Sequence, residues 1–397
     1  MTIEELDLAF EETGEKGRHR RRRRSGKKRG RGRSVMALFM ALVLLGALGG
    51  GVWYGFDRIR GFFVAPDYTT AGSGQVTIEV KNADTATDIG NTLVKADVVK
   101  SAGAFIKAAQ GNPLSKNIQP GFYQLRHQMR AADALTALLD LKNKIVSKVT
   151  IPEGATYKEV YAALSKATKI PVAEFEKAGK DPIGLGVPEW WFNRTDKKPA
   201  NKTIEGFLFP KTYEFPPGTT AESALKTIVE QFNTEMADLD FVNVVQTQRR
   251  ISPYEALIAA SIAQAEALKD EDMGPVVRVL YNRAYTGKFP CSCLGLDSTV
   301  NYWLKITGKG GKASEHLSKS ELHNPKNPYN THDVGGMPVG PIGNPGVAAL
   351  KGAMNPPQTD YYYFVSIDTK GTMAYAKDYA GHKANIRKAC DNGIPLC

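Results

Sequence analysis

The chain has few cysteines and few histidines for its length. Only 4 cysteines and 6 histidines occur among 397 residues, and the histidines show no metal-ligand spacing. No Gly-rich phosphate loop precedes a helical pattern and no Gly-x-Ser-x-Gly motif occurs, which argues against nucleotide-dependent and serine-hydrolase chemistry. Apolar residues make up 42% of the chain, enough for two or three globular units and too many for a disordered protein.

Acidic residues are absent from residues 16–33, a stretch that carries 12 Lys and Arg. The formal net charge of the whole chain is +11, so the remainder carries −1 and is nearly neutral. The basic charge therefore belongs to a tail and not to a surface along which a duplex could lie, and nucleic acid is not an expected partner. We expect the tail to set membrane topology and to bind anionic lipid headgroups; docking of a cytoplasmic partner or nucleic acid is the alternative.

Charged residues are also absent from residues 35–56, a run of 22 that is long enough for one membrane-spanning helix. Trp53 and Tyr54 lie at its far end, where interfacial aromatic residues are common. We therefore predict a basic cytoplasmic tail at 1–34, a single membrane-spanning helix at 35–56, and the rest of the chain on the outer side of the cell membrane. A cleaved signal peptide is the alternative, although its apolar core is usually shorter.

The four cysteines all lie in the portion predicted to be extracytoplasmic, where an even number is compatible with two disulfides. They are Cys291, Cys293, Cys390 and Cys397. Because only one residue separates Cys291 from Cys293, we expect each of them to pair with one of the two C-terminal cysteines. A zinc site is the alternative, but Cys-x-Cys with two distant cysteines matches the usual spacings poorly.

The predicted outer portion divides into a linker and two folded units. Residues 57–74 read as a linker, because they contain Pro66 and a small, polar run at 69–74. From Gln75 the pattern predicts a strand, a helix from about Thr85, a second helix near 102–110, a return strand at 120–125 and a helix over 129–142. This unit, 75–148, resembles a LysM-like module in size and order. A larger α+β domain is expected at 149–397, so the fold class is α+β.

A buried helix with one acidic residue at its end is the clearest candidate for chemistry. Ser252 and Glu255 form a capping-box pattern around Pro253, which suits the first helical position. Residues 256–268 are apolar on nearly every face, and Glu266 is the only ionisable residue among them. Burial there would raise the pKa of Glu266 toward that of a general acid. The alternative is that Glu266 only marks the end of the helix.

Five segments resemble, in order, the motifs of the YceG-like family, the endolytic murein transglycosylases. They are 260–266 (ASIAQAE), 281–283 (YNR), 297–302 (DSTVNY), 329–331 (YNT) and 340–346 (GPIGNPG). The resemblance extends from about residue 149 to 385 and makes 149–397 the expected catalytic domain. Gln264, Ser298 and His332 depart from the residues usual in the family.

The resemblance implies cleavage of nascent peptidoglycan strands between N-acetylmuramic acid and N-acetylglucosamine. The product carries a 1,6-anhydro end, strand elongation is limited, and neither cofactor nor metal is needed. The resemblance places the catalytic role on Glu266. One carboxyl is sufficient because the 6-hydroxyl of the substrate attacks in place of water, whereas ordinary glycosidases need two. Glycan strands, the membrane and peptidoglycan synthases are the expected partners.

Six further residues are expected to orient the sugars or Glu266. They are Asn282, Asp297, Thr299, Tyr302, Asn330 and Thr331. For the Asn, Asp and Thr side chains, the alternative is a hydrogen bond to loop backbone. Two alternatives remain for the whole protein: a non-catalytic scaffold that binds peptidoglycan, or a membrane-tethered protein whose function resides in its basic tail.

Overall fold

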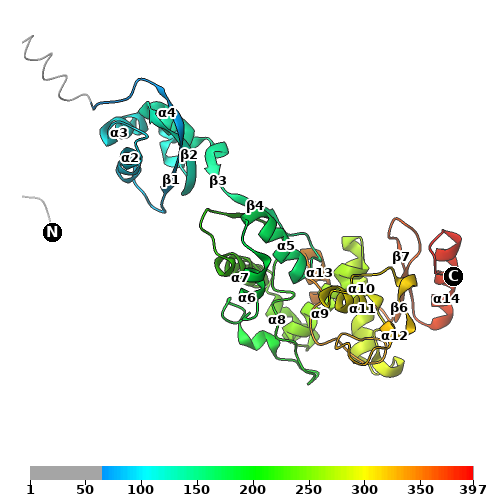
Figure 1. The fold of residues 1–397 in the computed structure, drawn as a ribbon. Helices are drawn as coiled ribbons and strands as arrows, with labels where there is room; N and C mark the ends of the chain where they lie inside the picture. The colour runs from blue at the N-terminus through cyan, green and yellow to red at the C-terminus, as the bar shows by residue number, and fades with distance from the viewer. Residues whose placement is uncertain (1–64, 397) are drawn as a thin grey trace, which may run out of the picture. The chain divides into compact units, whose positions relative to one another are not determined.

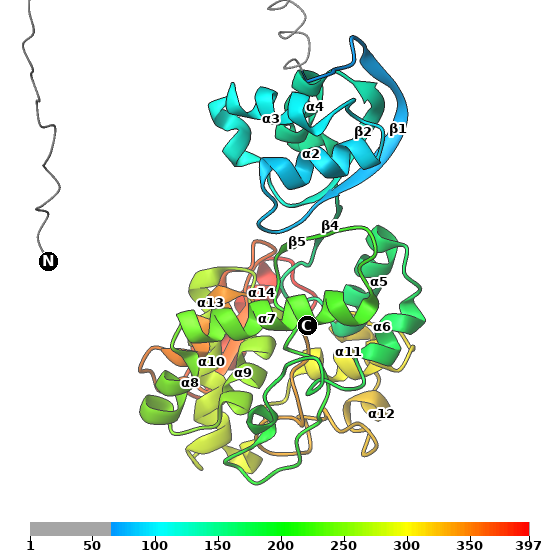
Figure 2. The same cartoon turned by 90° about the vertical axis from the view of Figure 1, so that its left-hand side faces the viewer.

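The computed structural model describes residues 65–396. The expected tail and membrane helix, at 1–34 and 35–56, and Cys397 lie outside these residues. Between residues 65 and 396, no helix is both long and apolar enough to cross a bilayer. Figure 1 and Figure 2 show short strands accompanied by many helices, so the fold is of the mixed α+β class, as the sequence predicts.

The first part of the described chain is a three-stranded antiparallel sheet with three helices. Its elements are β1 (Ala71–Val80), α2 (Ala86–Lys95), α3 (Ala102–Gln110), β2 (Gly121–Met129), α4 (Ala131–Leu139) and β3 (Lys144–Ile145), and the strand order is β1-β2-β3. Thr85 and Asp88 form a capping box that starts α2 at the predicted position. β1 begins at Ala71, inside the range expected as linker, because Ala71 pairs with Met129 on β2.

The second part consists mainly of helices, with two small antiparallel strand pairs, β4–β5 and β6–β7. Its elements are β4 (Ser147–Thr150), α5 (Tyr157–Thr168), α6 (Val172–Ala178), β5 (Thr212–Phe215), α7 (Ala221–Asp238), α8 (Phe241–Val244), α9 (Pro253–Glu266), α10 (Asp270–Tyr285), α11 (Asp297–Ile306), α12 (Lys319–Leu322), α13 (Val347–Met354), β6 (Tyr363–Ser366), β7 (Met373–Ala376) and α14 (Tyr379–Asp391). The β6–β7 pair packs against α14.

Helix α9 is the centre of this second part. Ser252 accepts a hydrogen bond from the Glu255 amide, and the Glu255 carboxylate accepts one from the Ser252 amide, which confirms the capping box. Every residue of α9 from Pro253 to Ala263 is buried, against α10, α13 and neighbouring segments. A helix that is apolar all round is stable only when it is covered on all sides, so α9 fixes the position of its C-terminal residue, Glu266, firmly.

Aromatic residues fill the core beside α9. Trp191 and Phe192 are buried against Phe207 and Tyr254, whereas Trp190 is 43% exposed. The pair Trp191–Phe192 is thus part of the hydrophobic core.

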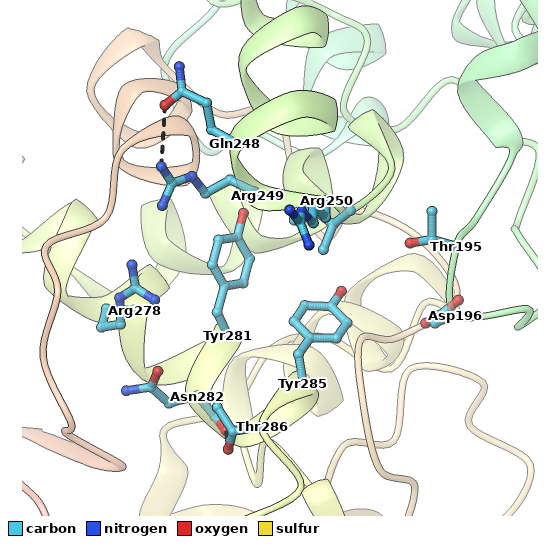
Figure 3. A pocket seen from close by; sticks show the side chains of 11 residues that line it. Thr195, Asp196, Gln248, Arg249, Arg250, Arg278, Tyr281, Asn282, Tyr285 and Thr286 are labelled. Atoms are coloured by element: carbon cyan, nitrogen blue, oxygen red, sulfur yellow. Dashed lines mark hydrogen bonds between the residues drawn. The ribbon is translucent and has the colours of Figure 1, made fainter.

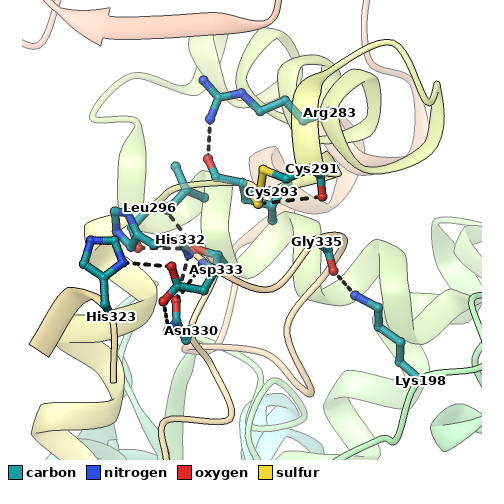
Figure 4. The surroundings of a disulfide bond; sticks show 12 residues. Lys198, Arg283, Cys291, Cys293, Leu296, His323, Asn330, His332, Asp333 and Gly335 are labelled. Atoms are coloured by element: carbon teal, nitrogen blue, oxygen red, sulfur yellow. Dashed lines mark hydrogen bonds and ion pairs between the residues drawn. A yellow bond between two sulfur atoms is a disulfide. The ribbon is translucent and has the colours of Figure 1, made fainter. Parts of the chain in front are cut away.

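Cys291 and Cys293 form a disulfide with each other, which corrects the expectation that each would pair with a C-terminal cysteine. The reason is local backbone conformation. Cys291 and Ser292 both have positive φ, at 56° and 50°, and this tight turn brings the two cysteine Cα atoms to 5.2 Å. Cys293 also forms an isolated bridge with Gly335, and the Ser292 carbonyl accepts a hydrogen bond from the Gly336 amide, so the disulfide loop lies against residues 335–336 (Figure 4).

Candidate active site

Glu266 is the last residue of α9 and is half-buried at the edge of the core. Burial raises the pKa of its carboxyl above the ordinary value. The Ser298 hydroxyl offsets part of this rise in pKa, the charge of Asp297 adds to it, and the Arg283 guanidinium offsets a further part. A carboxylic acid that holds its proton at higher pH than usual is suited to act as a general acid.

A pocket of about 540 Å³ is lined by neighbours of Glu266 but not by Glu266 itself, and most of its lining residues are polar. Its walls include Ala265, which precedes Glu266, and Ser298, which follows Asp297. Its remaining lining residues come from the loop before α5, from α11 and its following loop, and from the 340–346 segment: Gly154, Thr156, Asn301, Tyr302, Lys305, Gly311, Lys312 and Ile342. Hydroxyl, amide and ammonium groups therefore converge beside the candidate acid, and these groups suit a hydroxyl-rich ligand.

The 340–346 motif is held against α9 by two side chains. Ser261 Oγ accepts a hydrogen bond from the Ile342 amide at 3.0 Å, and Gln264 Oε1 accepts one from the Gly346 amide at 2.9 Å. Gln264, one of the departures from the family pattern, therefore has a structural role, because it helps to position the segment that contributes Ile342 to the pocket.

Asp297 begins α11 and pairs with His332. His332 Nε2 lies 3.2 Å from Asp297 Oδ1, and this contact lowers the pKa of the aspartate. Asp297 therefore loses its proton at lower pH than Glu266 does. Two carboxyl groups with pKa values displaced in opposite directions are typical of acid–base sites. Of the six expected positioning residues, Asp297 is the one whose charge acts directly on Glu266.

Thr299, Asn330 and Thr331 join the start of α11 to the loop at 330–333, and none of them lines the pocket. Thr331 Oγ1 accepts a hydrogen bond from the Leu296 amide at 3.0 Å and lies 3.0 Å from Thr299 Oγ1. Asn330 Oδ1 accepts from the His332 amide at 2.8 Å, and its Nδ2 donates to Asp333 at 2.9 Å (Figure 4). These bonds to loop groups match the alternative given by the sequence, and they place Asp297 and His332 side by side.

Asn282 and Tyr302 have different surroundings. Asn282 Nδ2 donates to the carbonyls of Thr359 and Tyr361, at 2.9 and 2.8 Å, so it anchors the approach to β6. It lines a separate pocket and is not brought to the one beside Glu266. Tyr302 does line that pocket, and its ring packs edge-on against Tyr329 at 4.7 Å between centroids.

Arg283 supports the site from α10. Its Nε donates to the Tyr362 carbonyl at 2.6 Å, and its Nη1 donates to the Leu294 carbonyl (Figure 4). Its guanidinium also stacks on Phe289 at 4.5 Å, and burial lowers its pKa to about 10. It therefore ties β6 to the loop that leads into Asp297.

Glu205 is a buried carboxyl that the sequence analysis missed. Its side chain is fully buried, and burial raises its pKa to about 8. Its Oε1 accepts hydrogen bonds from the Tyr157 amide at 3.0 Å and from Asn344 Nδ2 at 3.1 Å, and the nearby Tyr302 offsets part of the rise in pKa. A single acid in the apolar run 204–210 was the signal that could have revealed it. No group of His, Cys, Asp or Glu able to hold a metal ion occurs in the described part of the chain.

Fold and site together define a mixed α+β protein with an acidic side chain of raised pKa beside a polar pocket. The sequence profile of the YceG-like family matches residues 78–388. The chain belongs to the YceG-like family.

Named relatives and a solved structure agree with this assignment. The endolytic murein transglycosylase of Bacillus subtilis (strain 168) is 28% identical over 326 residues, covering 77% of this chain and 82% of the relative. That of Streptococcus pneumoniae serotype 2 (strain D39) is 25% identical over 371 residues, covering 87% of this chain and 63% of the relative. The crystal structure of a YceG-like protein from Listeria monocytogenes superposes with a TM-score of 0.51 at 25% identity, covering 78% of this chain and 98% of the other.

Proposed function

We propose that this protein is an endolytic murein transglycosylase, a lyase that cuts peptidoglycan strands between N-acetylmuramic acid and N-acetylglucosamine. The names of the relatives in Bacillus and Streptococcus support the reaction. The catalytic role is assigned to Glu266 on one observation. Glu266 ends a buried helix, its pKa is raised, and its neighbours line a pocket with many polar groups.

In the proposed reaction, Glu266 first acts as an acid and then as a base. Protonated Glu266 gives its proton to the glycosidic oxygen, and the bond between that oxygen and C1 of N-acetylmuramic acid breaks. The 6-hydroxyl oxygen of the same sugar bonds to C1, and its proton returns to the Glu266 carboxylate. No water is consumed, the acid is regenerated, and the product has a 1,6-anhydro end that limits strand elongation.

Asp297 has an electrostatic role in this proposal. Its negative charge raises the pKa of Glu266, and the contact with His332 keeps Asp297 itself ionised. The same charge also favours the positive charge that develops at C1 during bond cleavage.

The test is mass spectrometry of products from uncrosslinked glycan strands incubated with the purified full-length protein. We expect anhydro-ended fragments from the wild type and a loss of at least 100-fold in rate for Glu266→Gln. Glu271→Gln, the same change at an exposed position of α10, is the matched control and should retain full activity. Reducing-end products would show a hydrolase, and equal activity of Glu266→Gln and wild type would exclude Glu266 as the acid. Strand binding without cleavage by the wild type would favour the scaffold alternative.

We also propose that the chain is anchored in the cell membrane by residues 35–56, with 1–34 in the cytoplasm and the catalytic domain, 149–397, outside. The charge asymmetry on the two sides of the apolar run supports this topology. In the test, cells with an intact cell membrane but permeabilised outer layers are treated with a protease that does not cross the membrane. The catalytic domain should be degraded and the tail should be spared. Protection of the catalytic domain would refute the topology.

Residues 75–148 are proposed to be a LysM-like module that binds glycan. Two features support this proposal. β1 and β2 pair antiparallel, and α2 and α3 lie between these two strands along the chain. Deletion of 71–146, which removes β1 entirely and leaves the β4–β5 pair intact, should weaken sedimentation with purified peptidoglycan while leaving Glu266-dependent cleavage measurable. Peptidoglycan synthases remain proposed partners, to be tested by crosslinking in cells.

A further inference from the structure

A second pocket, of about 490 Å³, lies at the other end of α9 from Glu266. The π-helical turn Val245–Arg249 leads into it from one side, and α10 forms another wall (Figure 3). Helix α9 has 14 residues, so its two ends are about 20 Å apart. The pocket is therefore separate from the candidate active site.

Three arginines dominate the lining of this pocket: Arg249, Arg250 and Arg278. No carboxylate within residues 65–396 lies at ion-pair distance from any of them. Asp196 also borders the pocket, but both of its oxygens are occupied by Arg194, at 2.9 and 2.6 Å. The pocket therefore has a surplus of positive charge.

Glu255, the other acid close to the pocket, is also satisfied by its own donors. Its oxygens accept hydrogen bonds from the Thr195 amide at 2.9 Å, the Ser252 amide at 3.1 Å and the Tyr285 hydroxyl at 3.0 Å. It makes no ion pair with the arginines. The three arginines are therefore available to an anion from solution.

The hydrogen-bond donors of Arg249 are incompletely used. Its Nη2 donates to Gln248 Oε1 at 3.3 Å, and its Nε is buried without a hydrogen-bond partner. A guanidinium has five N–H donors, and a buried unsatisfied donor costs free energy. Figure 3 shows the Arg249 guanidinium to the left of the Tyr281 ring, on the same side as Arg278.

Arg278 is fixed in place by its own contacts. Its Nε donates to the Pro357 carbonyl at 2.6 Å and its Nη2 to the Pro356 carbonyl at 3.0 Å. Burial and the charge of Arg249 lower the pKa of Arg278, and the second cause reflects repulsion between the two guanidinium groups. A bound anion would relieve this repulsion.

We propose that this arginine pocket, formed by Arg249, Arg250 and Arg278, is a binding site for an oxyanion, a carboxylate or a phosphate. Arginine binds both in a bidentate manner. The stem peptides of peptidoglycan carry carboxylates, and a strand that is cut at Glu266 extends beyond the reacting bond, so stem peptides are one source of the anion. Free phosphate is the other. The assignment to stem peptides rests on the proposed function, whereas the anion site does not.

The site is tested by calorimetric titration of the full-length protein with inorganic pyrophosphate at constant ionic strength. We expect the Kd to rise at least 10-fold in Arg249→Gln and to stay unchanged in Arg387→Gln, which removes an exposed arginine of α14. Arg250→Gln, at an exposed position, should also weaken binding and serves as the test if Arg249→Gln does not fold. Three results would overturn the proposal. The wild type and both pocket variants could bind pyrophosphate with equal affinity, Arg387→Gln could weaken binding as much as the pocket variants do, or the wild type could fail to bind.

The source of the anion is tested by cleavage kinetics on strands with and without stem peptides. If stem carboxylates are the ligand, Arg249→Gln raises KM for stem-bearing strands, leaves kcat unchanged and does not affect stripped strands. If KM is unchanged on both substrates while pyrophosphate binding is lost, the ligand is a free phosphate-type anion. Absence of cleavage by the wild type would refute the proposed function and leave the titration result intact.

Discussion

Replacing Glu205 with Gln should remove a strong pH dependence from the stability of the protein. Burial raises the pKa of Glu205 to about 8, from 4.5 for the ordinary carboxyl. Between these pH values the folded protein keeps the proton and the unfolded chain loses it. The stabilising effect is therefore complete below the unfolded pKa and is lost as the pH rises through the folded pKa.

The size of the effect follows from the two pKa values. Stability falls by about 1.4 kcal/mol per pH unit in this range, up to about 5 kcal/mol in total. Gln has the shape of the protonated acid, and its oxygen is able to accept the bonds from the Tyr157 amide and Asn344 Nδ2, both of which reach the same oxygen of Glu205. The variant should therefore fold and lack the pH dependence.

The assay is urea unfolding followed by tryptophan fluorescence, at several pH values. Between about pH 5.5 and 7.5, the free energy of unfolding of the wild type should fall by about 3 kcal/mol more than that of Glu205→Gln. Glu271→Gln, which removes an exposed carboxyl, should follow the wild type. Parallel profiles for the wild type and Glu205→Gln would refute the reasoning, because they would mean that Glu205 is ionised in the folded protein at neutral pH.

Two further predictions concern the neighbourhood of Glu266. The charge of Asp297 raises the pKa of Glu266, so Asp297→Asn should lower that pKa. The alkaline limb of the pH profile of kcat/KM, where Glu266 loses its proton, should then shift to lower pH. An unchanged pH profile would contradict this coupling. Replacing both Cys291 and Cys293 with Ser should lower the free energy of unfolding by no more than about 2 kcal/mol, because the disulfide closes a very short loop. The measurement is urea unfolding. A loss above about 4 kcal/mol would show that the disulfide also fixes the neighbouring loops.

Local sequence patterns predicted helices both at the site and in the first part of the chain. The start of α9 at Pro253 follows from the capping box of Ser252 and Glu255, and α3 occupies 102–110 as expected. These features depend on residues within one or two turns of each other, so they can be read without knowledge of the fold. The position of Glu266 at the end of a buried helix follows from the same local pattern.

Side-chain roles in loops were harder to predict. Asn282 and Asp297 both belong to motif segments, yet Asn282 anchors backbone carbonyls near β6 whereas Asp297 acts on Glu266. The difference lies in which distant segment packs against each residue, and spacing in the sequence carries no such information. The pairing of Cys291 with Cys293 was also missed, because it depends on two consecutive residues with positive φ.

The sequence by itself determined that α9 forms, that it is buried and that it ends in an acid, because helix capping and apolar periodicity are local properties. The tertiary structure alone decided which groups surround that acid, and it alone revealed Glu205, whose partner Asn344 lies 139 residues away along the chain. The physical reason is that a pKa is set by burial and by neighbouring charges, and both are supplied by segments that meet only when the chain folds.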